Sequence, residues 1–115
     1  MHWTEISRRA AGAVVILDLH GQMTLSGDEQ PRLLRQIRQI VQEGHRQVLL
    51  NLTHVSYVDS TGIGEIVGAY ARVIREGGDL KLCGVSARTQ ELLDITNIGT
   101  IIESFASEAD ALESF

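Results

Sequence analysis

The side chains of this chain best suited to chemistry lie in one short run, residues 58–64, which reads Val-Asp-Ser-Thr-Gly-Ile-Gly. The run follows an apolar segment, residues 48–52, that is typical of a strand, and it precedes apolar residues at the three- and four-residue spacing of a helix. Asp59 is then the expected N-cap, and Ser60 falls on the first turn. Backbone N–H groups without helical partners and the helix dipole favour an anion there. The position therefore suits a nucleophile or a phosphate acceptor.

Three enzyme or ligand chemistries compete with a simple structural role for this run. A serine hydrolase elbow needs a glycine two residues before the nucleophile, where this chain has Val58, and a later histidine, whereas all four histidines precede Ser60. The aspartic protease signature is interrupted by Thr61 and occurs once. Glycine pairs such as Gly62 and Gly64, without a nearby lysine, are a weak nucleotide signal. Asp59 and Ser60 could also serve only as a helix cap.

The composition limits the classes of protein to which this chain can belong. The 115 residues suffice for one domain, 1–115, and a net charge of −5 argues against nucleic acid or an anionic membrane as partner. The histidines show no ligand spacing, so we expect no metal and no cofactor. Cys83 stands alone in an apolar segment and is interpreted as a core residue. The absence of a long apolar run or signal peptide predicts a cytoplasmic protein.

The order of elements predicts an α/β fold. A strand at 5–9 and one at 13–19 form a hairpin around residues 11 and 12; further strands are expected at 48–52, 80–83 and 101–102, with helices at 28–43, at 60–76, after Ser86 and after Ser107. Asp28 is preferred to Ser26 as cap of the first helix, because Pro31 then falls in the first turn. The order ββαβαβαβα indicates a mixed, mostly parallel sheet backed by helices.

Apolar spacing also predicts which helix faces are buried. The expected inner residues are Leu33, Leu34, Ile37, Ile40 and Val41; Ile63, Ile66, Val67, Tyr70 and Ile74; and Ala111, Leu112 and Phe115. The helix after Ser86 carries Leu92, Leu93 and Ile95. Gly64 and Gly68 lie inside the helix that follows Ser60, where glycine is costly. We attribute both glycines to close packing of the backbone against a neighbouring element.

With these residues assembled, the chain resembles the STAS domain family, and within it the bacterial anti-sigma factor antagonists. The resemblance covers nearly the whole chain and is most specific at residues 51–64, with a second part at 77–85. It implies a non-enzymatic switch in which Ser60 is the phosphoacceptor, within an environment formed by Asp59, Thr61 and Gly62. It also implies an anti-sigma factor kinase that binds the unmodified form, releasing a sigma factor, and a serine phosphatase that restores Ser60.

The predicted sheet also suggests a surface for the partner, because loops that leave the same end of a parallel sheet lie together in space. We expect it to comprise Gly21, Met23, Thr24, Ser26, Asp28 and Ile63 beside the Ser60 turn, with Met23 exposed. Thr24 departs from the family, which often carries a carboxylate there, so the identity of the partner is open. The alternative implied by the same family is a non-catalytic adaptor module of a transporter or a stress-signalling complex, in which Ser60 need not be modified.

Overall fold

A computed structural model of the chain describes residues 5–23 and 32–115. Its elements are β1 (Glu5–Ala11), β2 (Val14–Met23), α1 (Arg32–Gln42), β3 (Gln47–Val58), α2 (Ser60–Arg75), β4 (Asp79–Cys83), α3 (Ala87–Ile95), the 3₁₀ helix η1 (Ile98–Thr100), β5 (Ser104–Phe105) and α4 (Glu108–Glu113). The order of strands and α-helices confirms the α/β prediction. The predicted start of the first helix, at Ser26 or Asp28, lies outside the described residues.

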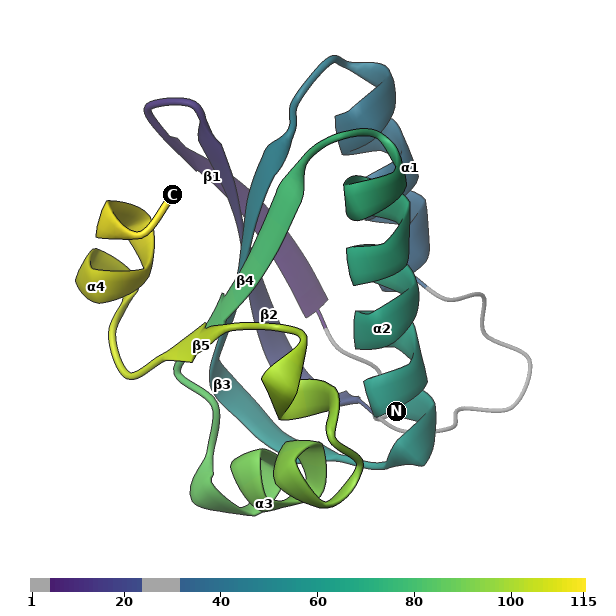
Figure 1. The fold of residues 1–115 in the computed structure, drawn as a ribbon, viewed down its shortest axis with the longest axis vertical. Helices are drawn as coiled ribbons and strands as arrows, with labels where there is room; N and C mark the ends of the chain where they lie inside the picture. The colour runs from purple at the N-terminus through teal and green to yellow at the C-terminus, as the bar shows by residue number, and fades with distance from the viewer. Residues whose placement is uncertain (1–4, 24–31) are drawn as a thin grey trace.

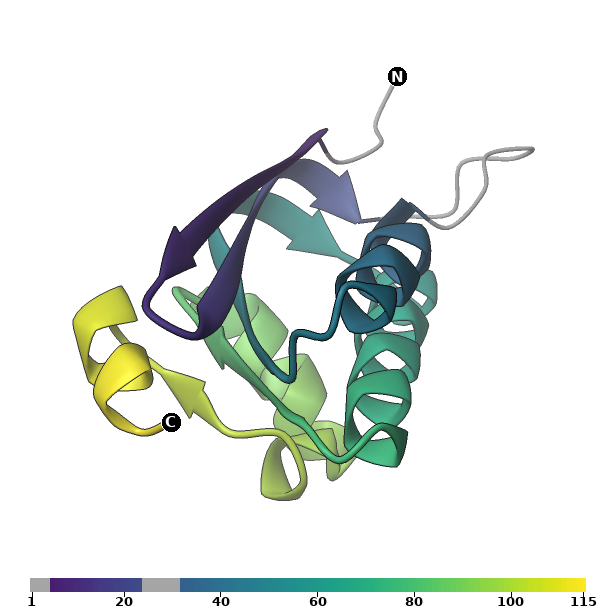
Figure 2. The same ribbon diagram turned by 90° about the horizontal axis from the view of Figure 1, so that it is seen from above.

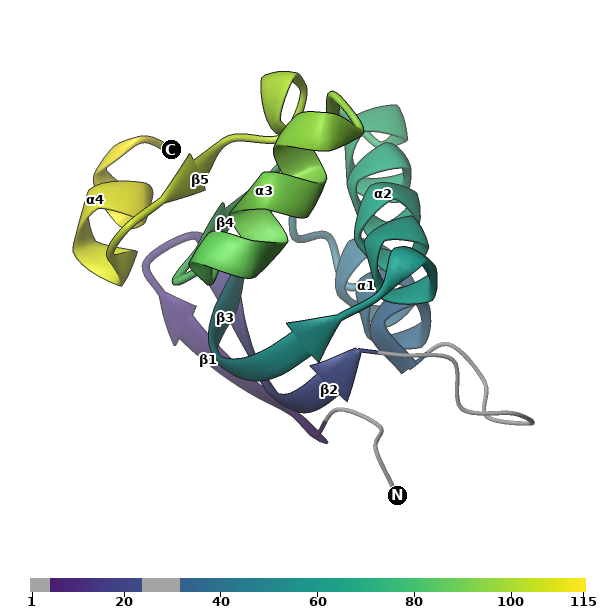
Figure 3. The same ribbon diagram turned by 90° about the horizontal axis from the view of Figure 1, so that it is seen from below.

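The strands lie in the sheet in the same order as in the sequence, β1-β2-β3-β4-β5. Only β1 and β2 are antiparallel, and the other neighbours are parallel. Helices α1 and α2 lie side by side on one face of the sheet, whereas α4 lies on the other face (Figures 1 and 2). Helix α3 sits at the end of the sheet where β3 stops (Figure 3). The end of β3, and with it the Ser60 turn, therefore lies between α2 and α3.

The main core fills the space between the sheet and the pair α1–α2. Leu17, Leu19 and Leu50 point into it from the strands, and Ile37 and Ile66 pack on them from the helices; all five are fully buried. Of the inner face predicted for α1, only Leu34 is partly exposed. A smaller cluster of Val14, Ile16, Leu49, Cys83 and Ala111 lies against α4 on the opposite face. Burial raises the pKa of the Cys83 thiol to about 11, which agrees with its interpretation as a core residue.

Both strands that lead to the site run further than the sequence pattern predicted. β2 ends at Met23 and β3 ends at Val58, because the two strands remain paired up to the contact of Met23 with Val58. Register shifts occur between Asp18 and His20 and between Gly21 and Gln22, which break the alternation that marks a strand in sequence. The turn of the first hairpin is also displaced by one residue and contains Gly12 and Ala13.

One prediction made for the C-terminal half was wrong. Residues 101–102 do not form a strand: Ile101 is 60% exposed, Ile102 packs into the core, and the edge strand is β5. In α3, Leu93 is buried and Ile95 is 71% exposed. The order of elements is unaffected, because β5 follows shortly after the predicted position.

The inner face of α2 was also predicted only in part. Val67 and Ile74 are exposed, whereas Ala69 and Val73 are buried in their place. The apolar residues of α2 extend around more than one face, so the spacing alone did not fix the buried side.

The two glycines inside α2 have different surroundings. A Cβ at Gly68 would lie 3.1 Å from the Leu34 side chain, so close packing against α1 accounts for this glycine as predicted. A Cβ at Gly64 would meet nothing within 4 Å, so the packing explanation is wrong there. Gly64 faces solvent one turn after Ser60. Helix α2 therefore has no side chain at this exposed position near Ser60.

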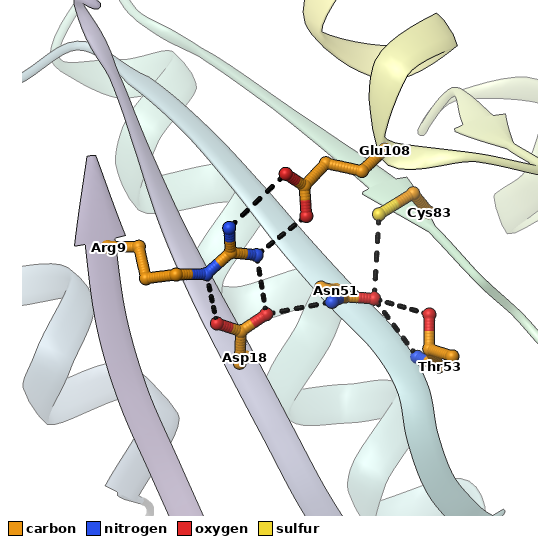
Figure 4. Close-up of polar contacts among 6 residues, drawn as sticks. All are labelled: Arg9, Asp18, Asn51, Thr53, Cys83 and Glu108. Atoms are coloured by element: carbon orange, nitrogen blue, oxygen red, sulfur yellow. Dashed lines mark hydrogen bonds and ion pairs between the residues drawn. The ribbon is translucent and has the colours of Figure 1, made fainter. Parts of the chain in front are cut away.

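A row of polar groups crosses the face of the sheet that carries α4 (Figure 4). This polar row consists of Arg9, Asp18, Asn51, Thr53, Cys83 and Glu108. Arg9 pairs with Asp18 and, at 2.6 Å, with Glu108 of α4; Asn51 donates to Asp18 at 2.7 Å and accepts from Thr53. The Arg9 guanidinium is the main cause that holds the pKa of Asp18 below its usual value. The row thus joins four strands to α4.

Candidate functional site

The Ser60 turn is built as its sequence predicts. Asp59 is the N-cap of α2 in extended conformation, and its carboxylate accepts a hydrogen bond from the Gly62 N–H at 3.0 Å. Ser60 is the first helical residue, and both Ser60 and Thr61 are exposed. The hydroxyl of Ser60 therefore lies at the positive end of a helix of 16 residues, accessible from outside.

The turn is fastened to the end of β2. The Asp59 N–H donates to the Met23 carbonyl at 3.1 Å, and Gly62 packs so close that a Cβ there would lie 2.3 Å from the same oxygen. No larger residue fits at Gly62 without moving backbone. The close approach gives a physical reason for the glycine of the motif, and it places Gly21–Met23 beside the turn, as expected for parallel strands that end together.

Not every predicted partner residue presents its side chain to this surface. Gly21 is exposed, but Met23 is fully buried and Ile63 is 5% exposed. The expectation that Met23 is exposed was wrong, because the pairing of β2 with β3 continues through Met23 and turns its side chain into the core. Thr24, Ser26 and Asp28 lie outside the described residues.

A buried carboxyl, that of Glu65, lies in α2 between one and two turns after Ser60. Glu65 is 8% exposed, and its Oε1 has no hydrogen-bond partner within the described residues. Removal from water, and secondarily the charge of Asp59, raise the pKa of Glu65 to about 7, while a hydrogen bond from the Leu33 backbone opposes the shift. The acidity of Glu65 therefore depends on the packing of α2 against the start of the described part of α1.

A pocket beside Ser60 was not foreseen from the sequence. It has a volume of about 370 Å³ and is lined by Tyr57, Val58, Asp59, Ser60, Arg88, Glu91, Leu92 and Ile95. The end of β3 and the start of α2 form one wall, and α3 forms the other. Arg88 lies over the ring of Tyr57, 5.4 Å from its centroid. No signal in the sequence predicts this pocket, because it depends on how α3 is oriented, and the exposure of Ile95 in its lining is known only from the structure.

The chemistry of this pocket is limited by the residues that line it. Among the described residues, its lining has hydroxyls and carboxylates but no histidine that could act as base for Ser60. Elsewhere, His20 and His54 stack on each other with ring centroids 5.0 Å apart. Over residues 5–23 and 32–115, no group of three or more histidine, cysteine or acidic residues could hold a metal. Nor is any helix in those ranges long and apolar enough to cross a membrane.

The STAS domain family matches residues 5–111, and the chain belongs to this family. Among curated proteins, it is 27% identical over 100 residues to an anti-sigma F factor antagonist of Paenibacillus polymyxa, with 86% of this chain and 84% of the relative covered. It is 42% identical over 62 residues to an anti-sigma-B factor antagonist of Bacillus subtilis, covering 54% of this chain and 57% of the relative. The chain thus spans little more than half the length of that relative.

Solved structures share the fold at low sequence identity. An anti-sigma factor antagonist from Mycobacterium paratuberculosis has a TM-score of 0.81 at 16% identity, covering 96% of this chain and 92% of that one. The Bacillus cell fate determinant SpoIIAA in its phosphorylated form has a TM-score of 0.71 at 17% identity, with 96% and 97% covered. A murine solute carrier anion transporter aligns with a TM-score of 0.68 at 18% identity, and 17% of its chain is covered. The fold therefore occurs both alone and within a transporter.

Proposed function

We propose that this chain is an anti-sigma factor antagonist whose activity is switched by phosphorylation of Ser60. In the unmodified form it binds an anti-sigma factor kinase and thereby releases a sigma factor; a serine phosphatase reverses the modification. The observation that carries the proposal is the exposed Ser60 hydroxyl at the first position of α2, beside the Asp59 cap. The curated relatives named as antagonists support the same role.

The surroundings of Ser60 suit a phosphate without refolding of the chain. Phosphorylation adds a charge of about −2 at neutral pH. Backbone N–H groups and the helix dipole stabilise an anion at the N-terminus of a helix. The Asp59 carboxylate already accepts a hydrogen bond from the Gly62 N–H, so the start of α2 is capped in the unmodified chain. The modification therefore changes the surface rather than the fold.

The effect on binding follows from the cost of burying that charge. Asp59 and Glu91 line the same pocket as Ser60, so a phosphate adds to two existing carboxylates. A partner that covers the turn must remove this group from water. Leaving a buried charge unpaired costs roughly 3–5 kcal/mol, enough to lower affinity by more than about a hundredfold. Electrostatic and steric exclusion is thus the proposed mechanism.

The experiment is to incubate the chain with candidate anti-sigma factor kinases from the same genome and to locate the phosphate by mass spectrometry. Wild type should gain one phosphate at Ser60, Ser60→Ala none, and Thr61→Ala, the matched control beside it, should be labelled like wild type. Binding of the kinase should be lost on phosphorylation and weakened only partly by Ser60→Asp, which brings one charge in place of about two. Labelling of Ser60→Ala would contradict the assignment.

The alternative is a non-catalytic adaptor module, and the structural similarity to part of a transporter is what speaks for it. In that case no kinase labels Ser60, and Ser60→Asp leaves partner binding unchanged. The curated matches named as antagonists favour the switch.

A further inference from the structure

Of the residues that the structure describes, Arg88 is the one basic residue that lines the pocket beside Ser60. It is an exposed residue on the first turn of α3, an element that follows the Ser60 turn by more than twenty residues in sequence. Its guanidinium lies over Tyr57, a residue of β3 that is itself 38% exposed. No ion pair between Arg88 and a carboxylate is present among the described residues. Its charge is thus held against an aromatic face, next to the phosphoacceptor position.

The other charges of the pocket are negative. Asp59 lies at the cap of α2 and Glu91 lies one turn after Arg88 on α3. A phosphate on Ser60 would meet these two carboxylates and one guanidinium. Arginine forms charge-assisted, forked hydrogen bonds with phosphate, which are stronger than its attraction to the quadrupole of an exposed ring. The guanidinium therefore gains more from a phosphate than from Tyr57.

We infer that Arg88 is the intramolecular partner of the phosphate on Ser60: it leaves the face of Tyr57 and pairs with the phosphate across the pocket. The inference rests on the proposed function in that it takes Ser60 to be the phosphorylated residue. No covalent step is involved beyond that modification. Both residues line the same pocket, and the guanidinium ends a long, flexible side chain, so the pairing asks for a change of the Arg88 rotamer.

Pairing of Arg88 with the phosphate changes the surface around Ser60 in a second way, beyond the added charge. In the unmodified chain the Arg88 guanidinium covers Tyr57 and the pocket next to Ser60 is open. In the phosphorylated chain the ring of Tyr57 is uncovered and the guanidinium lies over Ser60. The partner thus meets a rearranged aromatic and charged surface in addition to the phosphate.

The test uses the full chain with phosphoserine incorporated genetically at position 60, so that no kinase is required. The pH titration of the phosphate is followed by ³¹P NMR in wild type, in Arg88→Gln and in the control Arg75→Gln. Arg75 is exposed in the last turn of α2, at the end of the helix opposite Ser60. A guanidinium next to the phosphate favours the dianion, so the midpoint should be lower in wild type than in Arg88→Gln by about half a unit. Arg75→Gln should match wild type.

A second measurement observes the arginine itself. The Nε–H signal of Arg88 should shift between the unmodified and the phosphorylated chain, together with the ring signals of Tyr57. Equal phosphate midpoints in wild type and Arg88→Gln, or an unmoved Nε–H signal, would overturn the inference. Because neither readout involves a partner, a chain that binds its partner equally in both forms would refute the proposed function while leaving the pairing of Arg88 intact.

Discussion

Replacing Glu65 by glutamine should remove a pH dependence from the stability of this protein. Glu65 is buried beneath the Ser60 turn, and its pKa is raised from 4.5 to about 7, chiefly by its removal from water. In the unfolded chain the carboxyl returns to its ordinary pKa. Between these two values the folded protein binds more protons than the unfolded one, so stability falls as pH rises.

The magnitude follows from the separation of the two pKa values. A shift of this size corresponds to at most about 3 kcal/mol, since each pKa unit is worth about 1.4 kcal/mol. Water retains some access to the side chain, so about 1–2 kcal/mol is expected. The stability that protonated Glu65 contributes is fully present below pH 4.5 and is lost as pH rises from there to about 7. Above about pH 7, Glu65 causes no further change in stability. The lowered pKa of Asp18 acts in the opposite sense, below 3.8, and so lies outside this window.

The assay is urea unfolding at pH 5, 6, 7 and 8, with the free energy of unfolding taken from each curve. Wild type should lose about 1–2 kcal/mol across this range, whereas Glu65→Gln should be nearly constant and more stable than wild type at pH 8. Glu76→Gln, which changes an exposed carboxylate at the end of the same helix, should keep the slope of wild type. An equal slope in wild type and Glu65→Gln would refute the reasoning.

Three further predictions concern packing near and away from the site. Gly62→Ala should lower the melting temperature sharply, because its Cβ would meet the Met23 carbonyl. Gly64→Ala adds a Cβ that faces open space and should raise stability by about 0.5–1 kcal/mol. Thermal unfolding measures both variants, and equal effects would contradict the geometry. Met23→Asp places a carboxylate in the core and should unfold the chain as measured by circular dichroism, and a folded variant would show that Met23 is not buried. Lys81→Met removes donors to the Ser114 carbonyl and hydroxyl and should speed amide exchange in α4, with unchanged exchange as the contrary result.

The parts of the site that the sequence predicted are those determined locally. Asp59 as N-cap and Ser60 on the first turn depend on residues within one helical turn of each other, and Ser86 and Ser107 likewise cap their helices. The order of elements could also be predicted, because strands and helices alternate in the chain. The STAS family match agrees with that order.

The parts that were missed depend on contacts between distant segments. Met23 is buried because β2 stays paired with β3 beyond the point where its own pattern ends, and that pairing is a property of both strands. Glu65 is polar, and only the packing of α1 on α2 explains its burial. The pocket beside Ser60 requires α3 to fold back against the end of β3, and no residue spacing encodes that arrangement.

The polar row on the far face of the sheet has a consequence for the order in which the chain assembles. Arg9 and Glu108 pair directly although they are separated by 99 residues in sequence, and through Asp18 and Asn51 the same arginine is connected to β2 and β3 (Figure 4). A strand order that follows the sequence lets each strand dock on the one made before it, with short-range closure at every step. The pairing of Arg9 with Glu108 must wait until every intervening strand is in place. We therefore expect this exposed ion pair to form late in folding and to contribute little to guiding the chain there.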